Sequence, residues 1–250
     1  MTETTNSPLK RINFARVPEV LLQPQRTFGI IAEEARPSWS TPMLILSVTS
    51  ALAIIVSGYL NARAALMGEA PLPRDWDWWT PDMQANYMQA QQSMQGPVFS
   101  YVIPLVLGLI GLWLGWLILS GLLHLGSTLL GGRGTMPGAL NVVAWASLPF
   151  VVRDLLRVFF MLISGHSIQS AGLSGFAAES VFLAHILAQL DLFYLWYCIL
   201  LIIGFGFSES LTRNKVITGV AVLMVVVVLI QAGIGTATSG LSGLAFQRPF

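Results

Sequence analysis

The chain has 250 residues, of which 54% are hydrophobic and 10% are charged, and its formal net charge at pH 7 is +1. A soluble domain carries about 25% charged residues, so this composition excludes an ordinary soluble protein and indicates a membrane domain. The near-neutral balance also excludes a nucleic-acid partner, because no basic block is present to neutralise phosphates.

The chain opens with a polar and charged N-terminal arm over residues 1–36. Pro18 and Pro24 divide it into short pieces, and the stretch 25–35 is predicted to form a helix on the cytoplasmic membrane surface. Two interpretations of this helix stay open: a collar that packs on the membrane domain, or a surface that binds a partner. The apolar side chains that would form such a surface are Phe28, Ile30 and Ile31.

Five long apolar stretches follow the arm within a membrane domain over 37–240. Each reaches the roughly 20 residues that a helix rising about 1.5 Å per residue needs to cross about 30 Å of hydrocarbon. Hydrocarbon offers no water to backbone groups, and the runs are continuous, so helices are predicted and not strands. The sequence therefore predicts an all-α, polytopic membrane protein, a bundle of five transmembrane helices. The predicted spans are 42–61, 98–130, 140–164, 181–207 and 216–235.

Basic residues outside the spans predict the orientation. Eight lie on the side of the N-terminal arm and three on the other side, and basic loops favour the cytoplasm. The N-terminus is therefore predicted to be cytoplasmic, and the C-terminus to lie on the far side of the cell membrane. The eight are Lys10, Arg11, Arg16, Arg26, Arg36, Arg133, Arg213 and Lys215, and the three are Arg63, Arg74 and Arg248.

The first loop, 62–96, contains a predicted helix. Thr80, Pro81 and Asp82 form a good helix start, because they provide a capping hydroxyl, a proline in the first turn and an acid at the positive end of the helix dipole. We predict a short amphipathic helix on the exterior surface. Three tryptophans precede it, and this residue favours membrane interfaces and protein contacts. They are Trp76, Trp78 and Trp79, and they complete the candidate interaction surface.

Glycines mark the second span and the turn after it. Gly111 and Gly115 have the spacing that permits close helix approach, a pattern that is common by chance in membrane helices. The Gly-Gly-Arg-Gly stretch at 131–134 lacks the Lys-Ser/Thr of a phosphate-binding loop and predicts a tight turn between the second and third spans.

Charges inside the apolar spans form the strongest anomaly. Arg153, Asp154 and Arg157 lie in the third span, and insertion scales assign at least about 2.5 kcal/mol to each such group at the centre of a bilayer. Asp191 lies at a similar depth in the antiparallel fourth span, so we predict an internally neutral cluster of these four residues. Pro149, one turn earlier, favours a kink. The cluster has two interpretations, a structural bridge that fixes helix register or a proton or ion relay.

No catalytic, cofactor-binding or metal-ligating residues are predicted. His124, His166 and His185 lie at different depths, which disfavours a shared metal site, and the Gly-x-Ser-x-Gly and His-Glu-x-x-His motifs are absent. The single cysteine, Cys198, is interpreted as a small buried thiol. These observations favour a protein that is not an enzyme.

Several segments resemble the Yip1 domain family over residues 20–235. The family has a helix that ends in Gly-Gly with a small turn, followed by a helix with an aromatic residue, small residues and proline. In this chain the corresponding segments are Val-Leu-Leu-Gln-Pro-Gln-Arg-Thr-Phe at 20–28, Leu-Leu-His-Leu at 122–125, Leu-Gly-Gly-Arg-Gly at 130–134, Asn-Val-Val-Ala-Trp-Ala-Ser-Leu-Pro at 141–149, Leu-Trp-Tyr at 195–197 and Arg-Asn-Lys at 213–215.

The resemblance implies five spans with a cytoplasmic N-terminus, and no catalytic residues. Eukaryotic members of the family are membrane-traffic proteins that bind small GTPases and one another. The arm of this chain lacks the long cytoplasmic region of many eukaryotic members, which argues against a small-GTPase partner and favours a prokaryotic homologue.

Three functional hypotheses follow. The first is a non-enzymatic scaffold or accessory subunit that lies in the lipid bilayer and binds other membrane proteins. The second is a transporter, channel or transporter component that uses the charges of Arg153, Asp154, Arg157 and Asp191. The third is a membrane enzyme, for which the sequence offers neither a nucleophile–base pair nor a metal set.

Overall fold

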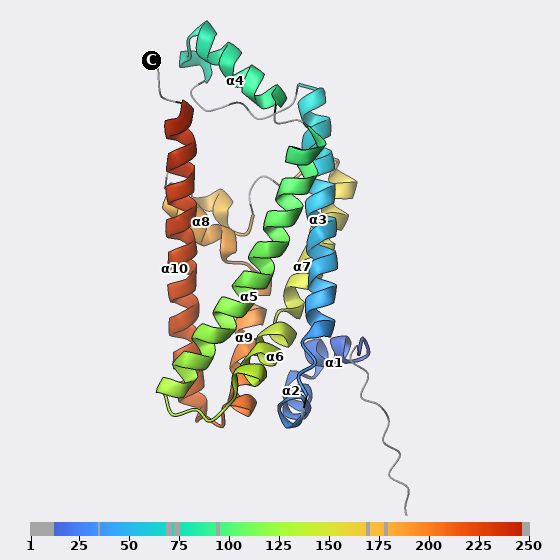
Figure 1. Cartoon of the computed structure of the whole chain (residues 1–250), viewed down its shortest axis with the longest axis vertical. Helices are drawn as coiled ribbons and strands as arrows, with labels where there is room; N and C mark the ends of the chain where they lie inside the picture. Colours follow the sequence, from blue (N-terminus) through green and yellow to red (C-terminus); the bar gives the residue numbers. More distant parts are fainter. Residues whose placement is uncertain are drawn as a thin grey trace, which may run out of the picture.

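The computed structural model of the chain describes residues 13–34, 36–68, 72, 76–93, 96–168, 171–177 and 180–246. Every regular element in these ranges is a helix, which confirms the predicted all-α class. The longer helices run roughly along one axis, with the N-terminal arm at one end and helix α4 at the other (Figure 1). The arm and the α4 segment therefore face opposite ends of the molecule.

Two short helices, α1 (Arg16–Leu22) and α2 (Pro24–Glu33), form the arm. Pro24 occupies the first position of α2, where no intrahelical N–H bond is needed, so its ring starts a helix without disturbing it. A helix is therefore present where the sequence predicts one over 25–35. Its side of the membrane stays a prediction.

The first long helix is α3 (Ser40–Leu66), and a short 3-10 turn, η1 (Trp76–Trp78), precedes α4 (Pro81–Ser93). The hydroxyl of Thr80 accepts a hydrogen bond of 3.4 Å from the backbone N–H of Met83, as expected of the predicted helix start. Helix α4 lies across the end of the molecule that is opposite the arm (Figure 1). Its exterior location stays a prediction.

The chain returns through a π-helical turn, η2 (Val98–Val102), and helix α5 (Ile103–Leu129). The turn after α5 is tight, as predicted. Gly131 has a φ of 92°, a left-handed conformation that glycine adopts without strain. The backbone N–H of Gly132 donates to the carbonyl of Ser127 at 2.8 Å and closes the helix end.

The predicted third span is two helices, α6 (Met136–Ala146) and α7 (Leu148–Ser164), which are interrupted at Ser147. The interruption lies two residues before Pro149, whose ring removes a backbone donor and crowds the preceding turn. The kink expected from this proline is therefore a break between two helices. The segment predicted as one kinked span over 140–164 thus consists of the end of α6 and the whole of α7.

The predicted fourth span is also broken. Helices α8 (Val181–Gln189) and α9 (Leu192–Ser208) meet at an angle of 59°. Asp191 begins α9 as its N-cap and has an extended backbone conformation, which ends α8 and redirects the chain. The last helix, α10 (Arg213–Phe246), runs the length of the molecule. A short 3-10 turn, η3 (Ser174–Phe176), precedes α8.

Among the described residues, three helices are long and apolar enough to cross a membrane: Ser40–Leu66, Val98–Leu129 and Arg213–Ser239. The bent pair α8–α9 raises the number to four if it forms one span. The chain is therefore a multi-pass membrane protein. The five-span count is not confirmed, because the third predicted span consists of two helices that are each too short to cross alone.

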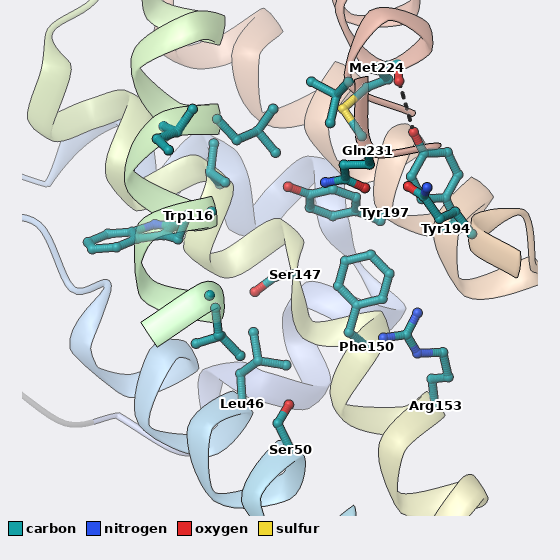
Figure 2. A pocket seen from close by; sticks show the side chains of 18 of the residues that line it. Leu46, Ser50, Trp116, Ser147, Phe150, Arg153, Tyr194, Tyr197, Met224 and Gln231 are labelled. Atoms are coloured by element: carbon teal, nitrogen blue, oxygen red, sulfur yellow. Dashed lines mark hydrogen bonds between the residues drawn. The ribbon is translucent and has the colours of Figure 1, made fainter. Parts of the chain in front are cut away.

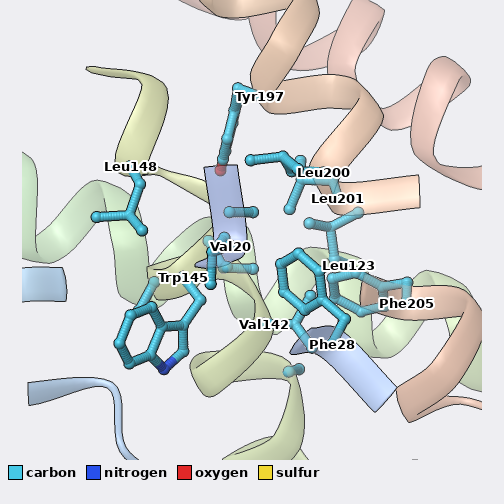
Figure 3. Close-up of a cluster of buried hydrophobic side chains, with 14 of the residues drawn as sticks. Val20, Phe28, Leu123, Val142, Trp145, Leu148, Tyr197, Leu200, Leu201 and Phe205 are labelled. Carbon is cyan, nitrogen blue, oxygen red and sulfur yellow. The ribbon is translucent and has the colours of Figure 1, made fainter. Parts of the chain in front are cut away.

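The core lies at the arm end of the molecule, around α6. Trp145 and Leu148 are fully buried, and the arm places Phe28 between α6 and α9 (Figure 3). A Cβ at Gly204 would lie 2.5 Å from Cγ1 of Val142 and 3.0 Å from the Phe28 ring, so only glycine permits this approach. The arm is thus an integral part of the helical bundle.

Labelling of single cysteines tests the orientation, since the arm and α4 lie at opposite ends. In a Cys198→Ser background, an impermeant thiol reagent on intact cells should label Gln92→Cys in α4 and leave Ser7→Cys unlabelled, because basic loops stay in the cytoplasm. Permeabilised cells provide the control, in which both variants should react. Labelling of Ser7→Cys alone in intact cells would invert the predicted orientation.

Candidate functional site

The four charged residues predicted to cluster lie together where α7 faces the break between α8 and α9. Atom Oδ2 of Asp191 is 3.6 Å from Nη1 of Arg153 and 3.8 Å from Nη2 of Arg157. The carboxylate of Asp154 is 3.6 Å from Nε of Arg153. We call these four residues the charge cluster. It contains two arginines and two aspartates.

The local structure of α9 positions Asp191. Its Oδ1 accepts a hydrogen bond of 2.8 Å from the backbone N–H of Tyr194 and so caps the helix. Capping satisfies one of the backbone donors that a helix start leaves unpaired. The same carboxylate then directs Oδ2 at the two arginines. The Asp191 side chain therefore caps the start of α9 and also pairs with the arginines of α7.

Asp154 links α7 to α3. The hydroxyl of Ser50 donates a hydrogen bond of 2.7 Å to its Oδ2. The ion pairs within 4.0 Å join Asp154 to Arg153 and Arg157 to Asp191. The charge cluster thus connects three helices, α3, α7 and α9.

The ion pairs of the cluster are loose. Their distances of 3.6 and 3.8 Å exceed the roughly 2.7–2.9 Å of a charge-assisted hydrogen bond. Nε of Arg153 is buried without a hydrogen-bond partner. Its Cζ lies 4.5 Å from the centroid of the Phe150 ring, a cation–π contact. The cluster is balanced in charge, yet it leaves guanidinium donors unused.

A cavity of about 600 Å³ adjoins the charge cluster. Arg153 and Phe150 lie at one part of its wall, opposite Trp116 of α5, and Tyr194 and Tyr197 come from α9 (Figure 2). A second cavity of about 510 Å³ is lined by residues of α3, α5 and α7. The two cavities share Ser50, Leu112, Arg153, Asp154, Arg157 and Ala171 in their walls. Three residues of the charge cluster, Arg153, Asp154 and Arg157, therefore border both cavities.

Gly111 and Gly115 line the larger cavity. No atom lies within 4 Å of the position that a Cβ would take at either residue. The close helix approach that their spacing permits is therefore not used against another described helix of this chain. Instead, these glycines enlarge the cavity.

The arm does not present the predicted docking surface. Phe28 is 1% exposed and Ile31 is 3% exposed, whereas Ile30 is 45% exposed. An amphipathic helix buries its apolar face where a neighbour offers one, and α9 does so at Gly204. This corrects the interaction-surface interpretation for Phe28 and Ile31 and favours the alternative of a collar.

A polar network holds this collar on α6. Arg16 pairs with the carboxylate of Glu34 and donates a hydrogen bond of 3.2 Å to the hydroxyl of Ser38. Nε1 of Trp145 donates to the same hydroxyl at 3.1 Å, and the backbone N–H of Ser38 donates to the side-chain oxygen of Asn141 at 3.0 Å. The arm is thereby attached by charge as well as by apolar burial.

The tryptophans of the predicted surface lie in and beside η1. Trp76, Trp79 and Tyr87 form an aromatic cluster with ring centroids 5.5 to 5.6 Å apart. Trp78 is 89% exposed. The aromatic cluster therefore supports α4 and leaves Trp78 free at the surface.

A buried carboxylate at the arm end of the molecule escapes sequence reasoning. Glu209, after α9, is 0% exposed, and its Oε2 accepts a hydrogen bond of 3.0 Å from the backbone N–H of Gly134. Nδ1 of His124 lies 3.5 Å from its Oε1. Neither of these two atoms has a hydrogen-bond partner. A lone acid that follows an apolar run, at the same end as His124 and a glycine turn, was the available signal.

The structure keeps the three histidines apart. His124 faces Glu209, the His166 ring stacks edge-on against Phe160, and His185 contacts Ser239 at 3.2 Å. Within the described ranges, no group of three or more His, Cys, Asp or Glu residues could hold a metal ion.

Comparison with known proteins gives one match. The family model of the Yip1 domain matches residues 19–235, a region that runs from the arm into α10 and contains the whole charge cluster. No curated protein and no solved structure matches the chain significantly.

Proposed function

Because this chain belongs to the Yip1 domain family, whose members are membrane proteins not known as enzymes, we propose that it is a non-enzymatic scaffold or accessory subunit that binds other membrane proteins. The observation that carries this proposal is the exposed Trp78 of η1, the turn that precedes α4. Tryptophan is enriched among the few residues that dominate the free energy of protein–protein binding.

The surface around Trp78 suits a protein partner. Met83 and Met88 of α4 are 39% and 44% exposed, and methionine adapts its shape to partners. The aromatic cluster of Trp76, Trp79 and Tyr87 packs η1 against α4. The backbone that carries Trp78 is therefore ordered before a partner binds and loses little conformational entropy on binding. In this function the charge cluster is a structural bridge that fixes the register of α3, α7 and α9.

A transporter or transporter component is the second candidate, and a specific observation favours it. The two cavities share the arginines of the charge cluster in their walls, and charged side chains within apolar membrane segments are typical of substrate or ion pathways. The two functions differ in a measurable property. A scaffold reconstituted in liposomes should show no ion flux and no proton-coupled uptake, whereas a transporter should lose its flux in Asp191→Asn.

Replacing the exposed tryptophan should weaken partner binding. We expect Trp78→Ala to reduce recovery of co-purifying membrane proteins at least about tenfold, since truncating a binding hot spot removes about 2 kcal/mol or more and about 1.4 kcal/mol is tenfold. Stability should be unchanged, because the side chain is 89% exposed. The measurement is quantitative mass spectrometry of proteins that co-purify with the tagged full chain in gentle detergent.

Phe176→Ala is the matched control, because Phe176 is an aromatic residue of η3 with 84% exposure. It should leave the recovered proteins unchanged. Equal recovery with Trp78→Ala and Phe176→Ala would remove this surface from the proposal. Ion or proton flux in liposomes, with no partner recovered, would replace the scaffold with the transporter.

A further inference from the structure

The charge cluster presents a cationic face to the larger cavity. Arg153, Asp154 and Arg157 line this cavity, whereas Asp191 does not belong to its lining. The side chains of the arginines are 24% and 30% exposed, against 8% for Asp154 and 16% for Asp191. The charged side chains that line the cavity therefore sum to a net charge of about +1, because the carboxylate that supplies the fourth charge, Asp191, is outside the lining.

The donors of this face are geometrically free. The carboxylates already accept hydrogen bonds, Asp154 from Ser50 and Asp191 from the backbone of Tyr194. Within the described ranges, the guanidinium groups of Arg153 and Arg157 make ion pairs at 3.6 to 3.8 Å but no hydrogen bond, and Arg153 also contacts the Phe150 ring. A guanidinium donates in a planar fork that matches the oxygens of a phosphate or carboxylate group. The acceptor that fits here is an oxyanion.

Away from the arginines, most of the cavity wall is apolar, although Ser147, Gln189 and Gln231 also line it. Its wall includes Met43, Leu46, Leu119 and Met224, and the bare glycines of α5 leave room beside them. A volume of about 600 Å³ falls in the usual range for a small-molecule site. A hydrocarbon chain could pack against the apolar part of the wall. The arginines line another part of the same cavity.

We propose that the cavity binds a single-chain amphiphile with an oxyanion head group, either a phosphate monoester or a carboxylate. The head group accepts hydrogen bonds from Arg153 and Arg157, and the chain lies along the apolar wall between α5 and α10. The charge cluster then has a second role besides joining helices. The aspartates neutralise the two arginines without hydrogen-bonding to them, so the guanidinium N–H groups can donate to the head group of the amphiphile.

Binding to the delipidated full-length protein in mild detergent, followed by native mass spectrometry, tests this proposal. The probes are palmitoyl lysophosphatidate, palmitate, hexadecanol and inorganic phosphate. At least one of the two oxyanion amphiphiles should bind about tenfold or more tightly than hexadecanol, because the charge-assisted hydrogen bonds are missing in the alcohol. The tighter of the two identifies the head group as phosphate or carboxylate. Inorganic phosphate should bind weakly, since it lacks the chain.

Variants that fill the cavity provide an independent test. Gly115→Leu places a side chain where no atom lies within 4 Å of the Cβ position, so it should reduce binding of the preferred amphiphile about tenfold while the protein still folds. Gly111→Leu is a second variant of the same design. Gly233→Leu is the matched control, because Gly233 of α10 has equal free space and lines none of the cavities described above.

Three results would overturn the proposal. The first is that neither oxyanion amphiphile binds more tightly than hexadecanol to the wild-type protein. The second is that the folded Gly115→Leu and Gly111→Leu variants bind as the wild type does. Inorganic phosphate that binds as tightly as lysophosphatidate would also contradict an amphiphile, because the apolar wall would then contribute nothing.

Discussion

Replacing Asp191 with asparagine should lower the free energy of unfolding by about 3 kcal/mol, near the lower end of the range for removing one partner of a buried ion pair. The substitution leaves Arg153 and Arg157 without the carboxylate that lies 3.6 and 3.8 Å from them. Asparagine still caps a helix, so α9 keeps its start and the loss reports the charge alone. Thermal and denaturant unfolding in detergent measure the effect.

A double-mutant cycle gives this prediction its control. Combining Asp191→Asn with Arg157→Gln or Arg153→Gln should recover part of the loss, because the unpaired positive charge is removed. Asp82→Asn, an exposed acid in the first turn of α4, should change stability by less than about 1 kcal/mol. If both pairs of substitutions are purely additive, Asp191 does not neutralise either arginine.

Replacing Gly134 with alanine should destabilise the protein by about 2–3 kcal/mol, a typical penalty for overpacking a buried site. A Cβ at this residue would lie 2.4 Å from Cδ and Oε1 of Glu209, and Gly134 does not have a positive φ. The penalty therefore comes from contact with the buried carboxylate and not from the backbone. Unfolding in detergent, at matched protein concentration, measures it.

A double-mutant cycle with Glu209 tests the source of the Gly134→Ala penalty. Glu209→Ala alone should cost about 1–3 kcal/mol, because the N–H of Gly134 loses its acceptor. In the Glu209→Ala background, Gly134→Ala should cost far less, since the clashing atoms are gone. Gly126→Ala, at a helical glycine with free space, should be neutral or slightly stabilising. A full penalty for Gly134→Ala without Glu209 would assign the loss to another contact.

Local chemistry made several elements predictable. Thr80 and Pro81 start α4, Pro24 starts α2, and Pro149 disturbs the third apolar stretch, because caps and prolines act through backbone groups a few residues away. The juxtaposition of the third and fourth stretches followed from counting residues back from one short connection. That count placed Asp191 at the depth of the arginines.

Other features have no local signal. The apolar run that contains Asp191 reads as one span, yet the carboxylate caps a new helix and bends the path by 59°. Phe28 and Ile31 read equally well as a collar or as a docking face, and the proximity of α9 decided for the collar. Glu209 reads as a loop acid, but the glycine turn at 131–134 encloses it.

The sequence by itself determined that this chain is helical, multi-pass and charged inside its apolar stretches, because the length and hydrophobicity of a segment decide its free energy in lipid. Only the tertiary structure decided which groups those charges meet. The partner of a polar side chain depends on which helices are neighbours and how far apart they pack. That distance is why the arginines of the charge cluster are neutralised by Asp191 and still free to donate hydrogen bonds into the cavity.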